Sequence, residues 1–350
     1  MATRGNFLKN ILVEEIAGDG GCYFGATTPP SEADVVIVSA PWSVTSDYGH
    51  GATYTPDAII DSSLGKELYD APTGLSIEGR IATAEIDYNI QEHSEMLGRD
   101  AERIVRHHSS KESRVSDYIA RKIENVNEGF AEMHLSIYKQ VKQWAEQGKR
   151  IAVVGGDHSV AFGAVKALAE QNEGLGVLFV DAHADYSREE EIFNYSHRSI
   201  ARNIVEELGG VAKMVQVGVR DVDRVEVEAL NACDKVETFY AESLAERRFE
   251  GCSWGDICRE IVSNLPQKVY ISFDVDALKI EFCNNTNAPT PGGMTFDEAL
   301  YLVNMVTASG REIVGFDISE VVSSINDKMD AIVGARLLAK LSVAMLREKK

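Results

Sequence analysis

Residues 177–187 read VLFVDAHADYS, an apolar run that ends abruptly in Asp181, His183 and Asp185. The continuous apolar character of residues 177–180 is typical of a strand that is buried on both faces of a sheet. Two carboxylates and an imidazole follow within five residues, and buried charges of this kind need partners. A single cluster is compatible with a solvated loop, so its meaning depends on what the rest of the chain supplies.

Other runs of the same kind predict a sheet with helices between its strands. Apolar, β-branched stretches lie at 34–39, 151–154, 214–219, 269–273 and 312–316. Between them, apolar residues recur at spacings near three and four, which predicts helices at 116–147, 160–171, 200–208, 254–264, 295–307 and 327–346. This alternation indicates a three-layer α/β/α fold with a central, mostly parallel sheet.

The remaining segments set the expected domain boundaries. The glycine-rich residues 1–33 are expected to form an N-terminal arm, and residues 34–350 a single α/β domain. Residues 106–118, RHHSSKESRVSDY, are expected to form a polar loop before the long helix.

Composition narrows the classes of partner. The 350 residues carry a formal charge of −20, from 55 acidic and 35 basic residues, which argues against nucleic acid as a partner. A small cationic substrate fits this charge, although acidity also serves solubility. No apolar run approaches the ~20 residues of a membrane span, and the N-terminus lacks the apolar stretch of a signal peptide. The five scattered cysteines form no CxxC pair, so we expect reduced thiols in a cytoplasmic protein.

Four of the predicted strands end in polar motifs: GGDHS at 155–159, DAHAD at 181–185, DVD at 274–276 and DISE at 317–320. Active sites of open α/β sheets lie beyond the carboxyl ends of the strands. A solvated-loop explanation would be needed four times, always at the same end of a strand, whereas one shared site explains all four. The metal-ligating side chains that it would gather are His158, Asp181, His183, Asp185, Asp274 and Asp276.

This set of ligands predicts a pair of divalent cations. Four carboxylates without counter-charge would repel one another strongly. Nitrogen and oxygen ligation without thiolate suits Mn²⁺ best, and other divalent metals also fit. Two shared carboxylates can hold two ions ~3.5–4 Å apart and generate a bridging hydroxide near neutral pH. In an extended segment, Asp274 and Asp276 would both lie on one side of the chain.

Five motifs of this chain resemble, in the same order, those of the ureohydrolase family, which includes arginase and agmatinase. They are GGDHS, DAHAD, SFDVDAL, PTPGGMT and FDISEV. The stretch YGHGATYTPDAI at 48–59 resembles the family's N-terminal GP-x-A-I element. The resemblance implies an arginase-like fold with two Mn²⁺ per chain and a homo-oligomer, either a trimer or a hexamer. It also implies that His158 and Asp185 bind one ion, that His183 and Asp276 bind the other, and that Asp181 and Asp274 bridge them.

The resemblance implies roles for three further residues and a second role for Asp185. Glu320 matches the glutamate that pairs with the substrate guanidinium; a helix-terminal charge is the alternative. His197 in FNYSHRSIARN matches a histidine that relays protons, and a surface histidine is the alternative. Asp223 in GVRDVD matches an aspartate that contacts the substrate's α-amino group, and a helix N-cap is the alternative. Asp185 would pass a proton to the leaving amine.

The segments expected to select the substrate depart from the family pattern. Arginase follows DAHxD with an Asn-Thr pair that reads the α-carboxylate, whereas this chain has Tyr186-Ser187-Arg188 and then three glutamates. Arg198 stands where the family often has glycine. At residues 286–289 this chain has TNAP, whereas the family usually has TGTP. Arg188 and Arg198 could read a substrate carboxylate or be surface charges.

These observations favour a metal-dependent hydrolase that converts a guanidino compound to urea and an amine through a manganese-bridging hydroxide. Agmatine is the preferred substrate because the Asn-Thr pair is missing. The alternatives are an arginase and a hydrolase of guanidino acids such as guanidinobutyrate. A single-zinc deacetylase-like amidohydrolase would not need His158 or the Asp274–Asp276 pair, and a non-catalytic binding protein would be expected to have lost ligands.

Overall fold

A computed structural model describes residues 21–46, 51–109, 116–187, 192–324 and 326–347 of the chain. Its centre is an eight-stranded sheet with the order β4-β1-β5-β10-β9-β6-β7-β8, and every strand pairing in it is parallel. The strands are β1 (Val35–Ala40), β4 (Ile81–Thr83), β5 (Arg150–Gly155), β6 (Leu175–Val180), β7 (Val211–Val219), β8 (Val236–Tyr240), β9 (Lys268–Asp274) and β10 (Glu312–Ser319).

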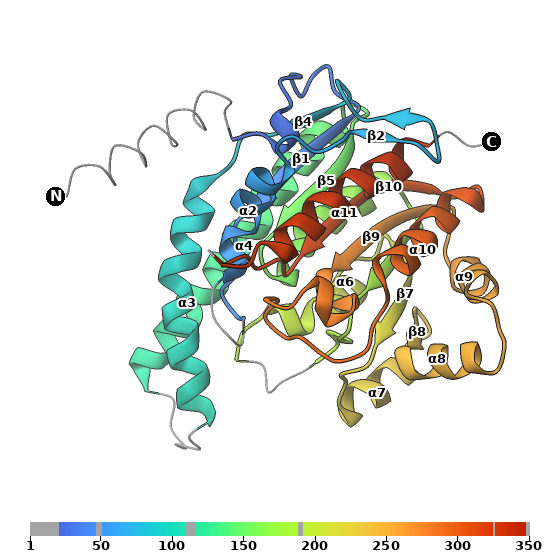
Figure 1. Ribbon diagram of the computed structural model, residues 1–350. Coiled ribbons are helices and arrows are strands. Elements are labelled where there is room, and N and C mark those ends of the chain that lie inside the picture. The colour runs from blue at the N-terminus through green and yellow to red at the C-terminus, as the bar shows by residue number, and fades with distance from the viewer. Residues whose placement is uncertain (1–20, 47–50, 110–115, 188–191, 325, 348–350) are drawn as a thin grey trace.

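Helices cover both faces of this sheet (Figure 1). One face packs against α3 (Tyr88–Ser109), α4 (Asp117–Ala145), α5 (Ala161–Gln171) and α6 (Ile200–Glu207). The other packs against α2 (Thr55–Ser63), α9 (Trp254–Ser263), α10 (Phe296–Ala308) and α11 (Met329–Leu346). The shorter helices α7 (Arg224–Asn231) and α8 (Ala241–Phe249) flank β8. The predicted three-layer α/β/α fold is confirmed.

Strand β1 shows why its residues form a buried strand. Val36 and Val38 point into one hydrophobic core, while Val35 and Ile37 point into the other, and all four are fully buried. A strand between two helical layers needs apolar side chains on both faces, because successive side chains alternate between them. The same reason accounts for the uninterrupted apolar runs of β5, β6 and β9.

The structure adds elements that the sequence patterns did not predict. The edge strands β4 and β8 are short or partly exposed, so neither shows the apolar run of a central strand. Helices α2, α3, α7 and α8 were also missed. The prediction of a polar loop at 106–118 is wrong at its start, because α3 continues through Ser109; residues 110–115 lie outside the described part of the chain. Tyr23, within the predicted N-terminal arm, is fully buried.

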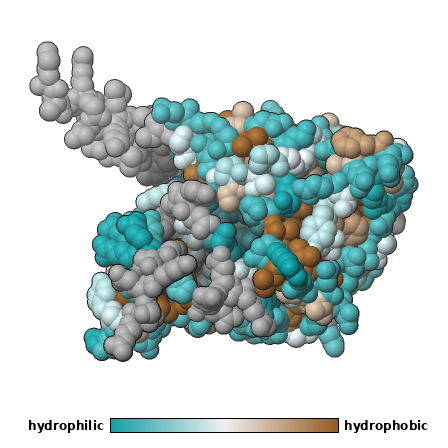
Figure 2. All heavy atoms as spheres, turned by 90° about the horizontal axis from the view of Figure 1, so that it is seen from below, coloured by the Kyte–Doolittle hydropathy of each residue, from teal (hydrophilic) through white to brown (hydrophobic). Residues whose placement is uncertain are grey.

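Seen from below the view of Figure 1, the surface is mostly hydrophilic, with hydrophobic residues in smaller patches (Figure 2). Within the described ranges, no helix is both long enough and apolar enough to cross a lipid bilayer.

One buried side chain in the helical layer makes stability depend on pH. His134 of α4 is buried between Phe162 and Tyr195, and its Nε2 lies 3.0 Å from the carbonyl oxygen of Ser159. Burial lowers the pKa of His134 to about 4, from an ordinary value near 6.5. Between these two values the unfolded chain binds a proton that the folded protein excludes, so stability falls as the pH decreases through this window.

We therefore predict that His134 contributes about 3 kcal/mol to the loss of stability between pH 7 and pH 4. Urea unfolding of the wild type and of His134→Gln should show a shallower pH dependence for the variant. Titration of all other groups is common to both proteins and cancels in the comparison. Equal pH slopes would show that His134 is protonated in the folded protein.

Candidate metal centre

The polar motifs meet at the carboxyl ends of four neighbouring strands. The strands β5, β10, β9 and β6 are adjacent in the middle of the sheet, and each predicted cluster follows one of them. A cavity of about 150 Å³ opens there. Its lining includes all the predicted ligands except Asp181: His158, His183, Asp185, Asp274 and Asp276.

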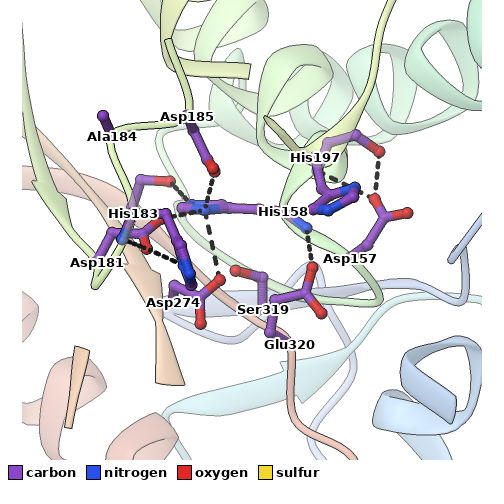
Figure 3. A network of polar contacts seen from close by, with 12 residues as sticks. Asp157, His158, Asp181, His183, Ala184, Asp185, His197, Asp274, Ser319 and Glu320 are labelled. Atoms are coloured by element: carbon purple, nitrogen blue, oxygen red, sulfur yellow. Dashed lines mark hydrogen bonds and ion pairs between the residues drawn. The ribbon is translucent and has the colours of Figure 1, made fainter. Parts of the chain in front are cut away.

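A first group of carboxylates surrounds His158 (Figure 3). The Nδ1 atom of His158 lies 2.9 Å from Oδ2 of Asp181, 3.1 Å from Oδ2 of Asp185 and 3.6 Å from Oδ2 of Asp274. All four side chains are buried. The donor atoms of His158, Asp181 and Asp185 lie within 4.8 Å of one another, close enough to hold one ion.

A second group lies next to the first and shares Asp181 with it. The Nδ1 atom of His183 is 3.0 Å from Oδ2 of Asp276 and 3.5 Å from Oδ1 of Asp181. These three residues form another set of donor atoms within 4.8 Å of one another. The two oxygens of Asp181 therefore face different groups, which is the arrangement that a bridging carboxylate needs.

Local turns after the strands aim these side chains. His158 opens a 3-10 turn, His158–Val160, directly after β5, and Asp157 caps that turn by accepting from the backbone nitrogen of Ser159. Gly156 is required before it, because a Cβ at this position would lie 1.6 Å from the carbonyl oxygen of Trp42.

The Asp274–Asp276 segment is not extended as the sequence suggested. Strand β9 ends at Asp274, and a 3-10 turn, Val275–Ala277, carries Asp276. The backbone nitrogen of Asp276 donates to Asp274 Oδ1 at 2.8 Å. Both carboxylates line the cavity, as predicted. The predicted extended backbone is wrong, because a 3-10 turn places Asp276 there.

Two residues of the site adopt left-handed backbone conformations. Asp185 has φ 48° and Glu320 has φ 62°. Side chains other than glycine rarely adopt this region, and such strain is retained when the surrounding structure enforces it. Glu320 directly follows β10, whereas Asp185 lies five residues after the end of β6, and both carboxylates line the cavity.

A hydrogen bond at Nε2 of His158 determines whether the other ring nitrogen, Nδ1, carries a proton or a lone pair. Nε2 lies 2.9 Å from Oγ of Ser272, whose hydroxyl donates to the buried carboxylate of Asp317 at 2.9 Å. Because the hydroxyl proton is directed to Asp317, Nε2 of His158 is the donor to Ser272. The Nδ1 lone pair is then left facing the carboxylates, as in a metal-ligating histidine whose other nitrogen is held by a hydrogen bond.

Buried like charges shift the titration of this site. Burial and the charge of Asp181 raise the pKa of Asp185 to about 6. Burial, with Asp276 and Asp181, raises the pKa of Asp274 well above its ordinary value. Burial alone would lower the pKa of His158, but Asp181 and Asp185 more than offset it, and the pKa is raised. Without bound cations the group would therefore take up protons.

The donor set fits a pair of divalent cations. His158 Nδ1 and Asp181 Oδ2 are buried and lack a hydrogen-bond partner among the described residues, although they are 2.9 Å apart. Two electron-pair donors in this position repel each other unless a cation or a proton lies between them. A metal ion satisfies both, and nitrogen and oxygen donors of this kind suit manganese and similar ions.

Glu320 and His197 lie on the neighbouring wall of the same cavity. The Nδ1 atom of His197 is 3.1 Å from Oγ1 of Thr45. Glu320 accepts from the backbone nitrogen of His158 at 3.1 Å and from Nδ2 of Asn287 at 2.6 Å. Burial raises the pKa of Glu320 to about 8, although His197 opposes this shift. The structure thus places both predicted residues next to the cavity.

The outer part of the cavity carries Asp221, Asp223, Glu226 and Arg198. Asp223 also caps α7, because its carboxylate accepts from the backbone nitrogen of Glu226 at 2.8 Å. The two alternatives for Asp223 are therefore compatible. Arg188, the other predicted carboxylate reader, lies outside the described residues.

Sequence reasoning missed several side chains of this wall. Thr45, Asp221, Glu226 and Asn287 were not selected as site residues. Asp221 lies within the GVRDVD motif and Asn287 within the altered TGTP motif, so both carried a signal. Thr45 and Glu226 belong to no motif, and only the path of the chain brings them here.

Known proteins with similar sequences and structures include ureohydrolases. Residues 33–343 match the arginase family. The N(1)-aminopropylagmatine ureohydrolase of Thermus thermophilus is 29% identical over 84% of this chain and 84% of its own length. The agmatinase of Pyrococcus horikoshii is 27% identical over 89% of this chain and 92% of its own length.

Solved structures show the same fold. Agmatine ureohydrolase of Thermoplasma volcanium superposes with a TM-score of 0.67 at 21% identity, covering 91% of this chain and 92% of that one. Arginase from Medicago truncatula gives 0.66 at 24% identity, covering 90% and 88%. The resemblance indicated by the motifs is confirmed. Because the family match extends over most of the chain, the protein belongs to the arginase family.

Proposed function

We propose that this protein hydrolyses a guanidino compound, with agmatine as the preferred substrate, to urea and an amine at a pair of manganese ions. Its family makes it a hydrolase of C–N bonds with a binuclear metal centre. The observation that carries the proposal is the pair of donor groups that share Asp181 beside the Glu320 carboxylate. The trimer or hexamer implied by the motifs stays a prediction.

The six ligands divide naturally between two ions. His158 and Asp185 would hold one and His183 and Asp276 the other, while Asp181 and Asp274 would contact both. When bound, two such ions would supply a water molecule that is deprotonated near neutral pH and can act as the nucleophile towards the guanidinium carbon.

Three side chains of the chain would handle the substrate. Glu320 would pair with the guanidinium, whose planar array of donors matches a carboxylate. Asp185, which lines the cavity beside the other ligands, would pass a proton to the leaving amine. His197 would move protons between this site and solvent, since an imidazole titrates close to neutral pH.

The charges of the outer cavity favour a substrate with a second cation. Asp221, Asp223 and Glu226 line the cavity, and Arg198 is the only arginine or lysine among its described lining residues. Three carboxylates attract the free amine of agmatine and disfavour the carboxylate of arginine or of a guanidino acid. The similarity to an agmatinase and to an aminopropylagmatine ureohydrolase points in the same direction.

The test is urea release, with Mn²⁺, from agmatine, arginine, guanidinobutyrate and guanidinopropionate. We predict the highest kcat/KM for agmatine. Asp223→Asn keeps an N-cap residue but removes the charge, so it should raise the KM for agmatine by about 2- to 5-fold, as for a partly exposed ion pair.

Arg198→Ala is the matched charge variant for this prediction. It should leave agmatine turnover nearly unchanged. If Arg198 instead reads a substrate carboxylate, arginine or a guanidino acid would be preferred. Arg198→Ala would then lower kcat/KM for that substrate by about 10- to 100-fold. Absence of urea from every compound would refute the proposed function.

A further inference from the structure

Asn287 donates a hydrogen bond to the Glu320 carboxylate. It lies between the short turn Ile280–Phe282 and α10, and only 7% of it is exposed. Its Nδ2 atom lies 2.6 Å from Oε2 of Glu320 and 3.1 Å from Oγ of Ser46. When Glu320 is ionised, as pairing with a cation requires, it only accepts, so the amide nitrogen of Asn287 rather than its amide oxygen faces it.

Both oxygens of Glu320 are therefore addressed by fixed donors. The backbone nitrogen of His158 donates to Oε1 at 3.1 Å, while Asn287 donates to Oε2. An ionised carboxylate has about four lone-pair sites, two on each oxygen. One site on each oxygen remains, and a forked pair of N–H donors on a planar cation can occupy both.

The amide of Asn287 is itself held in place. One amide proton is directed to Glu320 and the other to Ser46, whose Oγ lies 2.6 Å from Oγ of Ser43. Asn287, Ser46 and Ser43 are all buried. A donor with a fixed orientation restricts the rotation of the carboxylate that it contacts, which reduces the ordering required when a ligand binds.

We propose that Asn287 is a positioning residue that fixes the orientation of Glu320 for recognition of the substrate's guanidinium group. This role rests on the proposed function, since it requires Glu320 to bind that group. It concerns a position where the chain departs from the usual TGTP motif, and so a feature particular to this protein.

The substitutions Asn287→Ala and Asn287→Asp test the role in the manganese-loaded enzyme. Alanine removes the donor, whereas aspartate keeps the size and sets a second carboxylate against Glu320. Both should raise the KM for agmatine by about 10- to 100-fold, the range expected for a lost hydrogen bond to a charged group. The value of kcat should change little, because binding is weakened equally in the ground state and the transition state.

A second measurement separates positioning from general damage to the cavity. The inhibition constant of 1,4-diaminobutane, the amine that remains after urea is released from agmatine, should not change, because this molecule has no guanidinium group. Thr286→Val is the matched control: Thr286 is buried in the same segment, and its hydroxyl has no hydrogen-bond partner among the described residues. Its KM should equal that of the wild type.

The outcomes are distinguishable. If the wild type releases urea and the Asn287 variants keep its KM, the role of Asn287 is overturned while the proposed function stands. An equal rise in KM and in the diamine inhibition constant would also overturn it, as would the same rise in Thr286→Val. A wild type that releases no urea from any guanidino compound would overturn both.

Discussion

Asp274→Ala is expected to lose most of the bound manganese and to lower kcat/KM by at least about 10³-fold. The side chain is buried, and its Oδ2 lies 3.6 Å from Nδ1 of His158. Removing it would take one ligand from each ion. Metal analysis of the wild type should give about two ions per chain.

The isosteric variant Asp274→Asn separates this effect from loss of fold. Burial and neighbouring carboxylates raise the pKa of Asp274, so its negative charge destabilises the metal-free protein. In the presence of a chelator, Asp274→Asn should therefore melt at a higher temperature than the wild type, although it loses the metal and the activity. A folded Asp274 variant with normal metal content and normal turnover would contradict the assignment of the site.

His197→Ala is expected to lower kcat by ~10²–10⁴-fold while metal content stays at the wild-type value. His197 lines the cavity next to Glu320 but belongs to neither donor group, so its loss removes proton transfer rather than a ligand. Added imidazole should restore part of the activity, because a small base can enter the cavity in place of the missing ring.

Thr45→Val is the matched variant for His197. It removes the hydroxyl that lies 3.1 Å from the imidazole Nδ1 and leaves the ring in place, so kcat should fall much less than in His197→Ala. Unchanged turnover in His197→Ala would show that the histidine has no part in proton transfer. Loss of metal from that variant would show instead that its role is structural.

The ligands could be predicted from the sequence because each group is local. Asp181, His183 and Asp185 lie within five residues, and GGDHS and DVD are equally compact. Parallel strands deliver their carboxyl ends to one edge, so the patterns were sufficient to bring these segments together. The central strands were also predictable, because burial on both faces leaves continuous apolar runs.

The rest depended on features that have no local signal. Nothing in the sequence indicates that Asp185 and Glu320 adopt positive φ, since glycine usually marks such positions. The contact between Asn287 and Glu320 joins residues 33 positions apart through an irregular segment. The 3-10 turn at Asp276 follows from hydrogen bonding by Asp274 rather than from an apolar pattern.

The order of the sheet has a consequence for how the chain is made. Strand β10, the last of the sheet along the chain, lies between β5 and β9 near its centre. The ribosome synthesises all the other strands of this sheet before β10. In the finished sheet, β5 and β9 do not pair with each other, because β10 lies between them. The sheet therefore cannot be completed until residues 312–319 have been synthesised, because they join its two halves, β4-β1-β5 and β9-β6-β7-β8. Glu320 follows that strand directly. The residue proposed to bind the guanidinium group is therefore placed in the site only when β10 completes the sheet.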